Sequence, residues 1–135
     1  MSFHSVPLSY KPKLDAVFSG ACRQTIRLGR RYAVGDTVLF FEWTGRPRRS
    51  RWGRRITVKL TAVDKAILHP AGMAVLMGVA GWVTMPWDGC DGNTIATVAV
   101  ADFIDPPTGE ELKRVLEAFH GPFPVEGVEA QILRW

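Results

Sequence analysis

The most concentrated chemistry in the sequence is a run of six arginines within ten residues. The segment RPRRSRWGRR also contains Trp52, and Trp43 lies just before it. Guanidinium groups make planar, two-pronged hydrogen bonds to phosphate, and an exposed tryptophan can stack on a base. This pattern predicts a nucleic-acid contact, although a solvated loop that only keeps the protein soluble would have the same charge. The predicted contact residues are Arg46, Arg48, Arg49, Arg51, Arg54 and Arg55, with Trp43 or Trp52.

A second chemical pattern is the segment GACRQTIR, residues 20–27. In an extended chain, Thr25 and Arg27 point to the same side. A hydroxyl and a guanidinium on one face suit a base edge or a phosphate. A threonine hydroxyl is also a nucleophile when a base removes its proton. The residues by themselves favour a plainer interpretation, in which a strand threonine lies beside an arginine in a surface ion pair.

The remaining residues that could do chemistry predict neither a metal site nor a cofactor. His4, His69 and His120 are far apart in the sequence, so we expect surface or capping roles for them. The segment DGCDGN, residues 88–93, is faintly like a calcium loop but lacks the closing glutamate, so a double turn is expected. Cys22 and Cys90 match no metal motif and are expected to be reduced thiols.

Length and charge bound the class of protein. The chain has 135 residues, of which 47% are apolar and 22% charged, as in an ordinary single globular domain spanning 1–135. Residues 1–65 carry 14 Lys and Arg against 4 Asp and Glu, whereas residues 66–135 carry 3 against 9. The basic half would attract phosphates. The longest apolar run, 71–83, is too short to span a bilayer, and the start does not look like a signal peptide, so a cytoplasmic protein without membrane contact is expected.

The segments that must position these residues alternate between short strands and two helices. Strands are expected at 6–10, at 37–43, along the alternating segment RITVKLTAVDKAIL (55–68), within 70–83, at 94–104 and at 128–135. Residues 11–19 predict a helix with a proline in its first turn and Gly20 at its end. The arginine run falls between two of these strands, which indicates a hairpin loop.

The clearest helix is predicted over TGEELKRVLEAFHG. Thr108 and Glu111 have the spacing of a capping box, and Gly121 is expected to end the helix. An apolar stripe runs along one face of this helix and consists of Leu112, Val115, Leu116 and Phe119. Short strands with two or three peripheral helices predict an α+β domain built on a small curved sheet or barrel.

The order of these motifs resembles the ASCH domain family, a branch of the PUA-like superfamily. The matching segments are LSYKPKLDAVFSG, GACRQTIR, VGDTVLFFEW, VADFIDPPTGEELKRVLEAF and EAQILRW. The segment GACRQTIR resembles the family signature of a glycine, usually a lysine, and then Thr-Ile-Arg. Residues 69–93 have no counterpart in the family and are interpreted as an insertion. The family's late Asp-Gly-Phe motif corresponds here to Asp102 and Phe103.

The resemblance implies a small PUA-like β-barrel with a cleft where the Thr-Ile-Arg segment meets the basic loop. Family members are thought to bind RNA or nucleotides, so Arg23, Thr25 and Arg27 would line that cleft. Some members are amidohydrolases that deacylate N4-acetylcytidine, and ribonuclease activity is also associated with the family. Thr25 matches the threonine of the hydrolases, but Cys22 stands at the position of their lysine.

The sequence therefore leaves three hypotheses for the function. The first is an RNA- or nucleotide-binding domain that uses the Thr-Ile-Arg cleft and the arginine loop. The second is an amidohydrolase acting on a modified nucleoside, or a ribonuclease, with Thr25 as nucleophile and Cys22 in an altered role. The third is a docking module in which the arginine loop binds an acidic protein.

Overall fold

The computed structural model describes residues 2–8, 10–76, 81–87 and 108–135. The strands among these residues are β1 (Phe3–Pro7), β2 (Gln24–Leu28), β3 (Thr37–Trp43), β4 (Trp52–Lys59), β5 (Ala62–Leu68), β6 (Gly72–Leu76), β7 (Trp82–Pro86) and β8 (Val128–Arg134). The helices are α1 (Lys11–Ser19) and α3 (Gly109–His120). The strand predicted at 94–104 lies outside the described residues.

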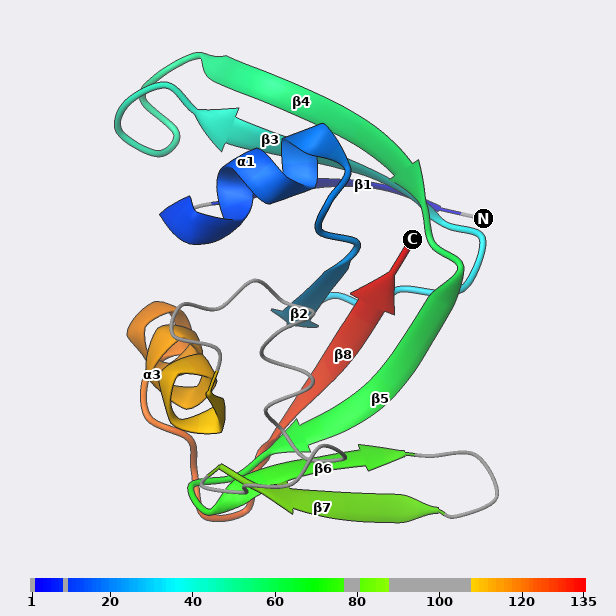
Figure 1. Ribbon diagram of the computed structural model, residues 1–135, viewed down its shortest axis with the longest axis vertical. Helices are drawn as coiled ribbons and strands as arrows, with labels where there is room; N and C mark the ends of the chain where they lie inside the picture. Colours follow the sequence, from blue (N-terminus) through cyan, green and yellow to red (C-terminus); the bar gives the residue numbers. More distant parts are fainter. Residues whose placement is uncertain (1, 9, 77–80, 88–107) are drawn as a thin grey trace.

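The strands form two sheets (Figure 1). One has the order β1-β3-β4, with β1 parallel and β4 antiparallel to β3. The other has the order β2-β8-β5-β6-β7, and all its neighbouring strands are antiparallel. The α+β class is therefore confirmed, whereas a PUA-like barrel stays a prediction. No helix within the described residues is long and apolar enough to span a bilayer.

The single strand predicted over 55–68 is wrong, because the structure divides this segment between the two sheets. The backbone N–H of Leu60 donates to Asp36, whereas that of Thr61 donates to Arg134 in β8. The alternation of apolar and polar residues continues from β4 into β5, although the two strands pair in different sheets, because each strand has one buried face. The first strand also lies earlier than predicted, at Phe3–Pro7.

Helix α3 covers one face of the five-stranded sheet through its apolar stripe. Leu112, Val115 and Leu116 pack in one core cluster with Ile26 of β2 and Ile132 of β8. The stripe ends one turn early, because Phe119 is 55% exposed and lies outside the cluster. The first three residues of the apolar stripe are therefore buried, and Phe119 is not.

The helix ends follow the sequence signals closely. The Thr108 hydroxyl accepts a hydrogen bond from the Glu111 backbone N–H at 3.2 Å, and Gly121 ends α3 with a φ of 82°. The second half of the capping box is replaced by an ion pair between the Glu111 carboxylate and Arg114. Gly20 ends α1 in the left-handed conformation, with a φ of 87°.

Helix α1 belongs to a second core cluster that joins the two sheets. Val17 of α1 packs there with Val38 and Phe40 of β3 and with Leu133 of β8. Leu133 lies on the face of the five-stranded sheet opposite to Ile132, so this sheet has a core on each face at the β2–β8 end. The segment expected to be an insertion supplies β6 and β7, the outermost strands at the other end.

Candidate functional site

Strand β2 places Thr25 and Arg27 on one face, as their spacing predicts. Thr25 is opposite Leu133 and Arg27 is opposite Gln131 in the pairing of β2 with β8. Thr25 is only 2% exposed, whereas Arg27 is half-buried. The two side chains therefore share a face but differ in their access to solvent.

The hydroxyl of Thr25 contacts a lysine that the sequence reasoning did not select. Nζ of Lys13, on α1, donates a hydrogen bond to Oγ1 of Thr25 at 3.0 Å, and Lys13 is only 5% exposed. Lys13 precedes the buried residue Ala16 by three positions and the buried residue Val17 by four. Helical periodicity therefore puts Lys13 on the buried face of α1. That position is the signal that could have identified it.

Cys22 occupies the position that the resemblance assigns to the family's lysine. Its side chain is fully buried in the second core cluster, and Sγ donates to the carbonyl oxygen of Gln24 at 3.3 Å. A catalytic role for Cys22 stays a prediction. The cationic group that contacts Thr25 comes from Lys13 of α1 instead.

The two arginines beside Thr25 have different surroundings. Arg23 is exposed, and its Nε donates to the carbonyl oxygen of Gly20 at 3.4 Å. Arg27 reaches the other sheet, where Nη2 donates to the carbonyl oxygen of Pro7 in β1 at 3.3 Å. Burial, and to a smaller extent the positive charge of Arg27, lowers the pKa of His120 at the end of α3.

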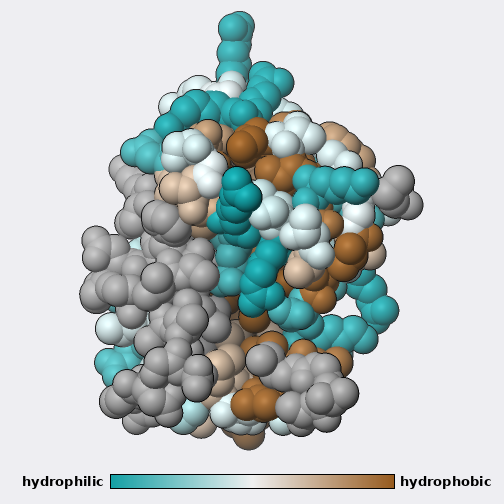
Figure 2. Space-filling view, turned by 45° about the vertical axis from the view of Figure 1, so that its right-hand side comes forward, coloured by the Kyte–Doolittle hydropathy of each residue, from teal (hydrophilic) through white to brown (hydrophobic). Residues whose placement is uncertain are grey.

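The arginine run forms the hairpin loop between β3 and β4, as predicted. Hydrogen bonds from the Thr44 backbone N–H to Arg51 and from the Ser50 hydroxyl to Arg46 close the loop. The upper end of the molecule, where β4 and this loop lie in Figure 1, is mainly hydrophilic in Figure 2. Four arginine side chains are exposed here and make no hydrogen bond or ion pair with any described residue. They are Arg46, Arg48, Arg49 and Arg51.

Arg54 is used within the fold, unlike the four exposed arginines. It forms ion pairs with Asp15 of α1 at 2.7 Å and with Glu42 of β3 at 3.1 Å. Its guanidinium also lies 5.0 Å from the centre of the Phe18 ring. The hydrogen bond from Arg54 lowers the pKa of Glu42. Arg54 therefore fixes α1 against the three-stranded sheet.

The two tryptophans beside the loop pack against other rings. Trp52 is stacked on Phe41 at 3.9 Å between ring centres, and Trp43 meets Phe41 edge-on at 5.1 Å. The guanidinium of Arg55 lies 5.5 Å from the Trp52 ring. Both tryptophans are half-buried, so each retains some surface for a ligand.

A groove of about 480 Å³ lies elsewhere, on the face of the five-stranded sheet that carries Thr25 and Arg27. Arg27 enters it with three further cations, Arg30, Arg31 and Lys65. None of the arginines of the β3–β4 loop lines it. The structure therefore brings Arg27 together with cations that the sequence reasoning did not select, and it separates this group from the loop.

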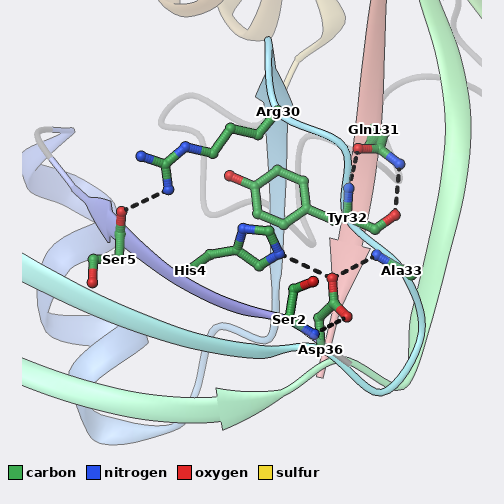
Figure 3. Close-up of polar contacts among 8 residues, drawn as sticks. All are labelled: Ser2, His4, Ser5, Arg30, Tyr32, Ala33, Asp36 and Gln131. Carbon is green, nitrogen blue, oxygen red and sulfur yellow. Dashed lines mark hydrogen bonds and ion pairs between the residues drawn. The ribbon is translucent and has the colours of Figure 1, made fainter.

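One wall of the groove is the segment that connects β2 to β3, and its conformation is fixed by side chains (Figure 3). The Gln131 amide accepts from the backbone N–H of Tyr32 at 2.9 Å and donates to its carbonyl at 3.0 Å. Arg30 donates through Nη1 to the carbonyl of Ser5 at 3.2 Å. The Tyr32 ring is buried between these contacts and the His4 ring, whose centre is 4.5 Å away.

Asp36 anchors the far end of the same segment (Figure 3). Its carboxylate accepts from the backbone N–H groups of Ser2 and Ala33 and pairs with Nε2 of His4 at 2.9 Å. The bond from Ser2, followed by those from His4 and Ala33, lowers the pKa of Asp36 to about 2. His4 is therefore a structural partner that ties β1 to this turn.

The described residues contain no group of three or more His, Cys, Asp or Glu side chains that could hold a metal ion. His69 and His120 lie on separate elements, β5–β6 and α3. The segment 88–93 and the residues Cys90, Asp102 and Phe103 lie outside the described residues.

Comparison of the chain with protein-family models, with curated proteins and with solved structures found no match.

Proposed function

We propose that this chain is an RNA- or nucleotide-binding domain of the ASCH type, with a PUA-like barrel as its fold. The observation that carries the proposal is the set of four exposed loop arginines, which have no ion pair with a described residue. Like charges held together without partners are unfavourable in the free protein, and a polyanion relieves that repulsion. Trp43 and Trp52, at the base of the loop, supply ring surface for an unstacked base.

Salt dependence gives the most direct test. Single-stranded RNA contacted by four arginines should bind with a slope of log affinity against log salt of roughly −3. The double variant Arg48→Ser, Arg49→Ser should reduce the magnitude of that slope by about 1.4, since each single-strand phosphate contact contributes about 0.7. Fluorescence anisotropy of a labelled twelve-nucleotide RNA measures both slopes.

A matched control removes the same amount of charge away from the loop. Lys59→Ser with Lys113→Ser changes the net charge equally but should leave the slope unchanged. An equal reduction in both variants would mean that net charge alone attracts the RNA. An unchanged slope in the loop variant would overturn the proposal. An acidic peptide that bound more tightly than RNA would favour the docking function.

A second candidate function, an amidohydrolase acting on an acylated cytidine, is favoured by the contact between Lys13 and Thr25. The Lys13 amine would take the Thr25 hydroxyl proton as Oγ1 attacks the acyl carbon. The resulting ammonium would return that proton to the departing cytidine nitrogen. Water would then hydrolyse the acyl ester on Thr25. The hydrogen-bond distance of 3.0 Å is suitable for this transfer.

Release of cytidine from N4-acetylcytidine, followed by chromatography, tests this second function. Thr25→Ala and Lys13→Met should each abolish turnover, whereas Lys59→Met should retain it. Cys22→Ala tests whether Cys22 has a catalytic role, because this variant should remain active if Lys13 supplies the base. If Cys22→Ala loses activity but keeps the native thermal stability, the catalytic role would be assigned to Cys22. Absence of turnover in the unmodified protein would refute the hydrolase function.

A further inference from the structure

The groove on the five-stranded sheet has the charge of an anion site. Arg27, Gln131 and Lys65 form one row across β2, β8 and β5, since Arg27 is paired with Gln131 and Gln131 with Lys65. Neighbouring strands are about 4.8 Å apart, so the two cations of this row start roughly 10 Å from each other. Arg30 and Arg31 complete the basic wall. Four cations therefore surround a space large enough to hold a phosphate between them.

Two of the groove cations have no ionic partner among the described residues. Arg31 and Lys65 are exposed and form no ion pair with a described residue. Arg30 uses one of its five N–H donors on the carbonyl of Ser5. Glu129 is the single carboxylate among the lining residues, and no ion pair joins it to a described cation. Arg31 and Lys65 therefore present positive charge to a ligand in the groove.

The opposite end of the groove is apolar and aromatic. Trp82 of β7 lies at this edge and is 49% exposed. Ile67 and Val128 also line the groove. An exposed indole beside an apolar surface favours a planar ring that can stack, as a nucleobase does. A plain inorganic anion would leave this half of the groove unused.

The size of the groove separates one small molecule from an extended polymer. A volume of about 480 Å³ is within the range of roughly 300–1,000 Å³ found for small-molecule sites. The wall that carries Arg30 and Arg31 is fixed by the Gln131 and Asp36 contacts, so little ordering is needed on binding.

We propose that this groove binds a single nucleoside monophosphate. Arg30, Arg31 and Lys65 hold its phosphate, and Trp82 stacks on its base. Arg27 contributes to the positive field from β2. This proposal deepens the proposed function and rests on it in one respect, because Arg27 belongs both to the Thr-Ile-Arg segment and to the groove. The loop arginines take no part in it.

Calorimetric titration with adenosine monophosphate, adenosine and inorganic phosphate tests the proposal. The monophosphate should bind at least tenfold more tightly than either fragment, because each fragment uses only one half of the groove. Lys65→Gln and Trp82→Leu should each weaken the monophosphate by about tenfold, in line with the loss of one charge-assisted hydrogen bond or one stacked base. Both side chains are exposed, so neither variant should unfold the protein.

Lys59→Gln removes one charge from an exposed position of β4 outside the groove, so it is the matched control and should bind the monophosphate normally. Equal weakening in this control and in Lys65→Gln would overturn the proposal. So would phosphate binding as tightly as the monophosphate, or absence of monophosphate binding at about 10 mM, where even a weak site would be occupied. RNA binding measured in parallel separates the two proposals. If RNA binds and the monophosphate does not, the groove site alone is refuted. If the monophosphate binds and RNA does not, RNA binding by the arginine loop is refuted.

Discussion

Gln131 is the residue through which the stability of the fold and the shape of the groove are most directly connected. Its amide closes two hydrogen bonds with the backbone of Tyr32, at 2.9 and 3.0 Å, and so joins β8 to the segment that carries Arg30 and Arg31. We predict that Gln131→Leu both destabilises the protein and weakens binding in the groove.

The magnitude follows from the groups left without partners. A net hydrogen bond contributes about 0.5–1.5 kcal/mol, and a buried polar group left unsatisfied costs about 1–3 kcal/mol. Tyr32 is only 7% exposed, but these hydrogen bonds are only partly buried. We therefore take the low end of the second range, about 1–1.5 kcal/mol, for each of the two Tyr32 backbone groups left without a partner, and expect a loss of about 2–3 kcal/mol. Gln131→Glu keeps the acceptor for the Tyr32 N–H but loses the donor, so about half of that loss is expected.

Urea unfolding followed by tryptophan fluorescence measures the free energy of unfolding for all three proteins. The expected order of stability is the unmodified protein, then Gln131→Glu, then Gln131→Leu. Binding of adenosine monophosphate should weaken in Gln131→Leu although the basic residues are all present. A loss below about 0.5 kcal/mol in Gln131→Leu would refute the reasoning, because the two bonds would then make no net contribution.

Three further predictions concern the fold. The pKa of Asp36, about 2, is below the unfolded value of about 3.9, so its contribution is present above pH 4 and is lost as pH falls toward 2. Acid unfolding curves should therefore show a weaker pH dependence below pH 4 in Asp36→Asn, and an unaltered curve would contradict this origin. Thr108→Ala should cost about 1 kcal/mol in urea unfolding by removing the cap of α3, whereas the exposed Thr57→Ala should cost far less. Leu68→Ala should cost about 2–5 kcal/mol by the same measurement, because Leu68 is fully buried, and a near-neutral result would mean that the cavity collapses.

Local patterns in the sequence predicted those helix ends and turns that depend only on neighbouring residues. The capping residue Thr108, the terminal Gly121 and the hairpin around the arginine run are each set by a few neighbouring positions, and all three are confirmed. The alternation over 55–68 predicted extended structure but could not show the change of sheet at Leu60. That change depends on hydrogen bonds to residues 36 and 134, which are remote in the sequence.

The candidate site was harder to predict for the same reason. The six arginines of the loop segment are close together in the sequence and were therefore easy to recognise. Of the groove cations, only Arg27 belongs to a motif, whereas Arg30, Arg31 and Lys65 belong to none, and Lys65 lies far from the other two in the chain. Lys13 was overlooked because a lysine in a short helix is usually a solvent-exposed residue. Its place on the buried face beside Val17 was the only local sign of its contact with Thr25.

The cations of this protein are of two kinds, those paired with carboxylates and those without such a partner in the part of the chain that the structure describes, and the arginine loop and the groove share the second kind. Arg54 and Arg114 are each held by carboxylates, and these ion pairs join or brace elements of the fold. The exposed loop arginines, like Arg31 and Lys65 in the groove, have no such partner among the described residues. Unpaired like charges held close together oppose folding, and structural needs do not account for keeping them. Two separate sets of such cations, one beside half-buried tryptophans and one beside an exposed tryptophan, are what a protein needs to recognise phosphate attached to a flat ring.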